Sequence, residues 1–205
     1  MLTAENANID AGIIERGIDE DLHFPHGFGG GVELESLNLP TVWLPLLGEN
    51  KSKHFEKANQ HIRPDEICPL LPFPSKNPRR SDDIFKEHHG LFFDVLRIES
   101  QNIMYVPEQN PFEVYRKIVL TIRNYQDSLS VLKGCKAVIS TFSSKLLSIG
   151  ALLAAYECKM DVNNYVGVLN VDSQGYKIKD LESVKSLRDQ SELFVIWLTG
   201  IPYIE

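Results

Sequence analysis

From residue 40 onward, the apolar and polar positions of this chain follow two alternating patterns. Short runs that are apolar almost throughout occur at 41–48, 66–74, 102–107, 136–140, 165–171 and 193–198. Stretches whose apolar residues recur every three or four positions lie at 50–62, 78–96, 111–132, 144–159 and 180–188. The first pattern is typical of strands buried on both faces, and the second is typical of helices with one buried face. We therefore predict strands and helices in alternation.

This alternation predicts an α/β fold in which successive strands run parallel and are connected by helices. Right-handed crossovers then give a doubly wound, mostly parallel Rossmann-like sheet with helices on both faces. The run 66–74 departs from the pattern, because it contains Pro69, Pro72 and Pro74. Proline cannot donate to the hydrogen-bond ladder of a sheet, so we expect this run to be irregular or close to a sheet edge.

The predicted helix 111–132 has the best-defined start. Asn110 is suited to the N-cap, Pro111 to the first helical position, and Glu113 to the position three after the cap. Asn77 and Pro78 open the preceding predicted helix in the same way. These local signals support the division of the chain into helices and strands.

Residues 1–35 differ from the rest of the chain. They hold eight acidic residues against Arg16 alone, a net charge of −7 that equals the charge of the whole chain. They also include a glycine-rich stretch, Gly27 and Gly29–Gly31, which follows no clear strand and indicates a flexible turn rather than a phosphate loop. We interpret 1–35 as an acidic irregular arm or edge hairpin and 36–205 as a single Rossmann-like domain. Because the domain itself is neutral, an anionic ligand remains compatible with it, whereas broad binding to duplex DNA is disfavoured.

The composition indicates a globular protein of the cytoplasm. Hydrophobic residues make up 43% and charged residues 24% of the sequence. No apolar run reaches the roughly 18 residues that a membrane span needs, and the first 20 residues lack the features of a signal peptide. The three cysteines have no metal-ligand spacing and are expected to be buried free thiols, and neither HisGluXXHis nor CysXXCys occurs. We expect no structural zinc, no other metal and no cofactor.

The candidate chemistry lies where the predicted strands end. In an open parallel sheet, ligands bind beyond the carboxyl ends of the strands. The polar residues predicted at these ends, and hence the candidate ligand-binding residues, are Glu49, Asn50, Lys51, Ser75, Lys76, Glu108, Asn110, Ser140, Thr141, Ser143, Ser144 and Lys145. Three of them are lysines that could face one rim and bind a phosphate-bearing ligand. The alternative is that these residues are the ordinary polar residues of loops and helix caps.

The turn 140–145 is the strongest of these candidates. It is rich in hydroxyl groups, ends in Lys145 and precedes a predicted helix, so free N–H groups, the helix dipole and a cation would all favour an anion there. It lacks the glycines and the GlyLysSer/Thr ending of a P-loop, and GlyXGlyXXGly is also absent from the chain. Triphosphate hydrolysis of the Walker type and a standard dinucleotide site are therefore not expected.

Residues 135–157 also resemble a known family. The strand, the IleSerThrPheSerSerLys turn and the following small-residue helix are similar to the second signature of CARF domains, the CRISPR-associated Rossmann-like sensors. The resemblance covers about residues 102–172. It implies a nucleotide-sensing domain of a prokaryotic antiviral defence system, with ligand contacts from Ser140, Thr141, Ser143, Ser144 and Lys145. Phe142 and Ser143 stand where glycines are typical of the family.

Three functions remain open from the sequence. The first is a nucleotide-sensing or regulatory subunit that binds a phosphate-bearing ligand and works with a protein partner or as a homo-oligomer. The second is a structural subunit that contacts a partner protein through the arm 1–35 and the late apolar segment 193–203. The third is a small nucleoside- or nucleotide-processing enzyme that uses Glu108 or a hydroxyl of the 140–145 turn. The catalytic residues of such an enzyme cannot be assigned from spacing, because no histidine spacing specifies a triad.

Overall fold

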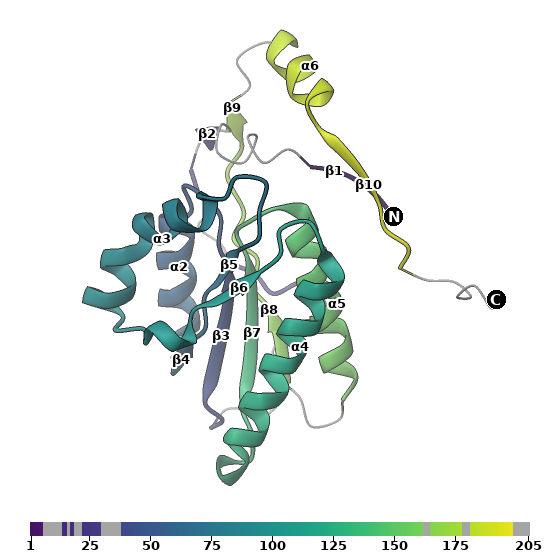
Figure 1. The fold of residues 1–205 in the computed structure, drawn as a ribbon. Coiled ribbons are helices and arrows are strands. Elements are labelled where there is room, and N and C mark those ends of the chain that lie inside the picture. Colours follow the sequence, from purple (N-terminus) through teal and green to yellow (C-terminus); the bar gives the residue numbers. More distant parts are fainter. Residues whose placement is uncertain are drawn as a thin grey trace, which may run out of the picture.

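The computed structural model describes residues 1–5, 14–15, 17–18, 22–29, 38–161, 165–177 and 181–198. Its centre is a parallel sheet whose main path runs in the order β6-β5-β3-β7-β8 (Figure 1). The strands of this path are β3 (Thr41–Leu46), β5 (Leu70–Pro72), β6 (Met104–Val106), β7 (Lys136–Thr141) and β8 (Tyr165–Val168). The short strand β4 (Glu66–Ile67) pairs with β3 beside β5.

Counted along the chain, the five strands of this path stand in the spatial order 3-2-1-4-5. This order belongs to the Rossmann type of doubly wound sheet, and the predicted fold class is confirmed. The chain moves outward in one direction from β3 to β6 and then returns to the centre to build β7 and β8. β3 and β7 therefore lie side by side, paired from Thr41↔Lys136 to Leu46↔Thr141, and the topological switch point lies between them.

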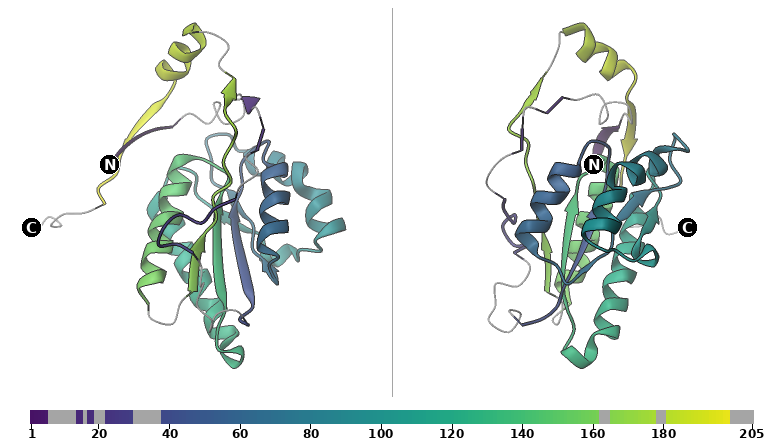
Figure 2. Two further views of the ribbon diagram at one scale, coloured as in Figure 1. Left: turned by 180° about the vertical axis from the view of Figure 1, so that it is seen from behind. Right: turned by 90° about the vertical axis from the view of Figure 1, so that its left-hand side faces the viewer.

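Helices cover both faces of the sheet (Figures 1 and 2). On one face lie α2 (Ser52–Ile62) and α3 (Arg80–Gly90), and on the other lie α4 (Pro111–Ser128) and α5 (Lys145–Met160). The central strand β3 is buried throughout and serves both layers. Its Trp43 packs with Phe55 of α2, whereas Leu44 joins the core formed with α4 and α5. This two-sided burial explains why the strands are almost continuously apolar.

Most predicted elements are present, and three are divided. The predicted helix 111–132 becomes α4 and a short 3-10 helix, Ser130–Leu132. The predicted helix 78–96 becomes α3 followed by a π-helical turn, Leu91–Val95. The predicted strand 66–74 becomes β4 and β5, and β5 lies between β3 and β6 rather than at an edge. Proline is tolerated there because β3 and β5 are paired only at Leu46↔Leu70. Pro72 lies beyond that pair. Because β3 has already ended at Leu46, no residue of β3 needs a hydrogen bond from the backbone nitrogen of Pro72.

The described parts of the arm lie against other strands. β2 (Ile14–Glu15) pairs antiparallel with β9 (Tyr176–Lys177). Isolated bridges then join Ile18 to Ser173, His23 to Asn170 and Gly29 to Gly167. The arm therefore runs antiparallel along the outer side of β8 and of the chain that follows it (Figure 2). This arrangement protects an edge of the sheet that would otherwise expose unpaired backbone groups.

The first and last strands form a separate two-stranded ribbon. β1 (Leu2–Glu5) pairs antiparallel with β10 (Glu192–Val195), which follows α6 (Leu181–Asp189). Phe194 and Ile196 on the inner side of this ribbon pack with residues of α5, among them Leu146 and Ile149. The predicted late strand 193–198 thus pairs with the N-terminus of the chain and not with the central sheet. None of the helices in the described ranges is both long and apolar enough to cross a membrane.

Candidate functional site

The turns after β3 and β7 meet at the switch point, and they approach each other very closely. A Cβ atom added to Gly48 would lie 2.5 Å from the carbonyl oxygen of Phe142 and 3.2 Å from the Cα of Ser143. Only glycine allows the two backbones to come this near. The backbones of the two turns are therefore in close contact at the switch point.

Two of the predicted hydroxyls belong to the end of β7. Ser140 is buried, and its Oγ accepts a 3.0 Å hydrogen bond from the indole N–H of Trp43, which is buried as well. This bond satisfies a polar group inside the core, which is a structural role. Thr141, the last residue of β7, is half-buried.

The N-terminus of α5 has the geometry of an anion site, and a carboxylate of the same chain occupies it. Ser144 is the N-cap, and its hydroxyl accepts a bond from the Leu147 N–H. The Leu146 N–H donates to the carboxylate of Glu5 at 2.8 Å, and Lys145 Nζ donates to the carbonyl oxygen of Ala4 at 3.0 Å. Both acceptors belong to β1 and its ribbon. A backbone amide of the first helical turn, the helix dipole and a lysine thus act together on the end of β1.

Ser143 adds an unused group beside this site. Its Oγ is buried and has no hydrogen-bond partner within the described residues. A buried hydroxyl without a partner is uncommon in folded proteins and calls for an explanation. The turn 140–145 therefore holds one buried hydroxyl without a partner in the described ranges.

A small hollow lies between α5 and the ribbon. It is lined by Glu5, Lys76, Glu108, Gln109, Ser144, Leu146 and Glu192, and its volume is about 20 Å³. This volume suffices for about one water molecule. Lys76 closes one side through an ion pair with Glu192 of β10. A second predicted ligand lysine is thus engaged by the ribbon.

A buried arginine connects three of the strand ends. Arg80 is 1% exposed and forms a two-pronged pair with Glu49, with Nε and Nη2 at 2.8 and 2.9 Å from its carboxylate oxygens. Its Nη1 donates to Glu108, whose other oxygen accepts a bond from the Lys76 N–H at 3.1 Å. Glu49 and Glu108 were predicted to bind a ligand, and the structure places both on Arg80. Both oxygens of Glu108 accept hydrogen bonds in this cluster, so its geometry does not favour a role as a catalytic base.

The other predicted residues cap helices or turns. Asn50 is in the left-handed conformation, with φ 59°, and precedes Lys51 at the N-cap of α2. The Asn50 N–H and the Ser52 hydroxyl donate to Glu87 at 2.9 and 2.6 Å, so a carboxylate also serves the start of α2. Asn110 caps α4 through the Glu113 N–H, and the Ser75 hydroxyl donates to the carbonyl oxygen of Asn77.

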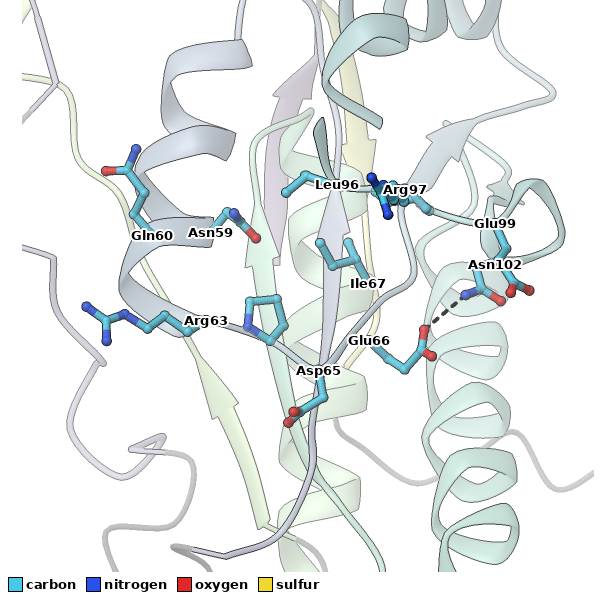
Figure 3. A pocket seen from close by; sticks show the side chains of 12 residues that line it. Asn59, Gln60, Arg63, Asp65, Glu66, Ile67, Leu96, Arg97, Glu99 and Asn102 are labelled. Atoms are coloured by element: carbon cyan, nitrogen blue, oxygen red, sulfur yellow. Dashed lines mark hydrogen bonds between the residues drawn. The ribbon is translucent and has the colours of Figure 1, made fainter. Parts of the chain in front are cut away.

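Larger hollows lie away from this rim. One, of about 650 Å³, lies beside β4 and the end of α2, away from the carboxyl ends of the strands (Figure 3). Arg63 and Arg97 line it, but the charged end of Arg63 points away from Arg97, and Glu66 accepts a bond from the Asn102 amide. The polar groups do not converge on one ligand position.

The second hollow, of about 740 Å³, lies between β6 and α4 and has mainly apolar walls. It includes Cys68, a thiol whose pKa is raised to about 12 by burial. Burial likewise raises the pKa of Cys135 and Cys158 to about 11. All three cysteines are buried and free, as predicted, and are neutral near pH 7.

The contacts at the rim, which is the edge of the sheet where the strands end, could be predicted only in part from the sequence. The turn 140–145 was found because its hydroxyls and lysine follow a strand, but Glu5 was not identified as its partner, nor Arg80 as the partner of Glu49 and Glu108. Glu5 lies 141 positions from Leu146, and the start of a helix is an ordinary place for an exposed arginine. No group of three or more His, Cys, Asp or Glu side chains within the described ranges is placed to hold a metal ion. No model of a known protein family and no curated protein matches this chain.

Proposed function

We propose that this chain binds a phosphate-bearing ligand at the N-terminus of α5 and acts as a nucleotide-sensing or regulatory subunit. One observation carries the proposal: the Leu146 N–H already binds a carboxylate, that of Glu5, next to the ammonium group of Lys145. The N-terminus of α5 therefore provides the hydrogen-bond donors and the positive electrostatic potential that bind an anion.

A phosphate group matches these donors better than a carboxylate does. It presents three acceptor oxygens and up to about two negative charges near neutral pH. One oxygen could take the Leu146 N–H, and a second could take Lys145 Nζ. The location also agrees with the general position of ligands in doubly wound sheets, at the carboxyl ends of the strands near the switch point.

The biological setting of the proposal comes from the resemblance to CARF domains. It suggests a cytoplasmic sensor in a prokaryotic antiviral defence system that passes its signal to a partner protein or to a second copy of itself.

Native mass spectrometry with a panel of ligands tests the proposal. The purified chain is measured alone and after incubation with ATP, cyclic AMP, a cyclic oligoadenylate and pyrophosphate. We expect a mass increase with at least one of them, and its loss in Lys145→Ala. Lys86→Ala, an exposed lysine of α3 paired only loosely with Asp83, is the matched control and should bind like the wild type. Equal binding by the Lys145 variant and the wild type would refute the proposed site.

The ribbon supports a second candidate function, a protein-interaction subunit. Its outer side presents Leu2, Leu193, Val195 and Trp197, which are between 62 and 83% exposed. Such a cluster of exposed apolar residues is typical of surfaces that contact another protein. This function would be favoured if the chain ignored every ligand of the panel while a co-purifying partner was lost in Val195→Asp.

A further inference from the structure

The ribbon β1–β10 covers the proposed anion site and is attached to it by the same groups that a ligand would use. Lys145 contacts Ala4, the Leu146 N–H contacts Glu5, and Lys76 contacts Glu192. Apolar packing of Phe194 and Ile196 against α5 supports these polar contacts. The N-terminal ammonium of Met1, which donates to the Ile196 carbonyl oxygen at 2.8 Å, ties the two strands together.

The volume left under the ribbon excludes a ligand. The hollow of about 20 Å³ holds roughly one water molecule, far less than a phosphate group with its attached nucleoside requires. A phosphate-bearing ligand can reach the Leu146 N–H only after the Glu5 carboxylate has left it. Because Glu5 and Glu192 of the ribbon also line this hollow, room for a ligand requires movement of the ribbon.

We infer that the β1–β10 ribbon is an autoinhibitory latch whose acidic residues occupy the anion site and are displaced by the ligand. The inference rests on the proposed function and adds its regulation. Glu5 acts as an internal competitor at the Leu146 N–H, and Glu192 holds Lys76. A ligand that recruits Lys145 and the Leu146 N–H removes the polar contacts between β1 and α5. The ribbon, which has only two strands and is marginal by itself, then separates from the helix.

The apparent affinity for the ligand equals the affinity of the open form multiplied by the fraction of molecules in which the latch is open. Removal of the Glu5 carboxylate should therefore tighten binding. We would measure the dissociation constant of pyrophosphate by isothermal titration calorimetry for the wild type, Glu5→Ala and Lys145→Ala. Glu56→Ala, which removes an exposed carboxylate from α2, controls for the change in net charge. Circular dichroism confirms that each variant is folded.

We expect Glu5→Ala to bind pyrophosphate about tenfold more tightly than the wild type, with Glu56→Ala within about twofold of it. If Glu5→Ala and the wild type bind equally and Lys145→Ala does not bind, the latch is wrong and the proposed function stands. If neither the wild type nor Glu5→Ala binds pyrophosphate or any ligand of the panel, both are wrong.

Hydrogen exchange provides an independent measurement of the same movement. In the wild type, the amides of residues 2–5 and 192–195 should exchange faster when pyrophosphate is present, because the ribbon loses its contacts with α5. Amides in the middle of α4 serve as the internal reference. Slower or unchanged exchange in the ribbon of a pyrophosphate-bound protein would overturn the latch.

Discussion

Replacement of Arg80 by methionine should severely destabilise the protein. Arg80 lies at the centre of a charged cluster that it forms with Glu49 and Glu108. Its side chain is 1% exposed, against 20% for Glu49 and 6% for Glu108. The methionine side chain fills much of the same space but removes the guanidinium group that pairs with both carboxylates. Two poorly solvated negative charges then remain side by side.

The expected loss of stability follows from the two carboxylates that Arg80 neutralises, those of Glu49 and Glu108. Removal of one partner from a buried ion pair typically costs about 3–5 kcal/mol, because the other charge stays buried without compensation. For a chain of this length, 1 kcal/mol corresponds to about 2–4 °C in the melting temperature. Arg80→Met should thus lower the melting temperature by roughly 6–20 °C. Urea denaturation, followed by circular dichroism, gives the free energy of unfolding directly.

The matched control is the neighbouring residue. Arg79 is exposed and its side chain makes no ion pair within the described residues, so Arg79→Met should change the stability by less than about 0.5 kcal/mol. The triple variant Arg80→Met, Glu49→Gln, Glu108→Gln removes all three charges and should recover much of the loss. An Arg80→Met protein within about 1 kcal/mol of the wild type would refute the idea that the cluster depends on charge compensation.

Further predictions concern the packing and the thiols. Gly150→Ala places a Cβ 2.4 Å from the carbonyl oxygen of Pro111, so it should push α5 from α4 and destabilise the fold by about 1–3 kcal/mol in urea denaturation, although alanine is the better helix former. Ser140→Ala leaves the Trp43 indole N–H buried without its acceptor and should cost about 1–3 kcal/mol by the same assay, and a neutral result would contradict the structural role of this hydroxyl. Because burial raises the pKa of all three thiols to about 11 or 12, they stay protonated below pH 9 and should react with a disulfide reagent at pH 8 only after unfolding. Rapid labelling of the folded chain would disprove their burial.

The fold was largely predictable because its signals are local. Each buried strand is an apolar run such as 136–140, and the start of α4 is marked by Asn110 and Pro111. The strand order was not predictable, because it depends on which face of the sheet each connecting helix covers. Apolar positions alone do not distinguish the face of α2 and α3 from the face of α4 and α5.

The site was predictable only in part, because its contacts join distant segments. The turn that ends in Lys145 was recognisable from residue types in sequence. The carboxylate that it binds comes from Glu5, and the pairing of β1 with β10 joins the two ends of the chain. Glu5 was counted with the charge of the arm, since no periodicity links it to α5. Two of the three predicted lysines contact the ribbon: Lys76 pairs with Glu192, and Lys145 donates to the carbonyl oxygen of Ala4.

The acidity of the rim connects the proposed site with the proposed latch. Carboxylates serve the starts of two helices that point at the rim, Glu87 at α2 and Glu5 at α5, but they are held differently. Glu87 comes from α3, a helix whose buried residues fix its backbone against the sheet. Glu5 comes from a two-stranded ribbon that contacts the domain mainly through α5 and Lys76. If a ligand replaces a carboxylate at this rim, we expect it to replace Glu5. Moving a two-stranded ribbon costs less free energy than moving a helix that is packed on the core. The same argument predicts that Glu87→Ala would weaken the fold without tightening the binding of pyrophosphate, and the opposite result would place the ligand at α2.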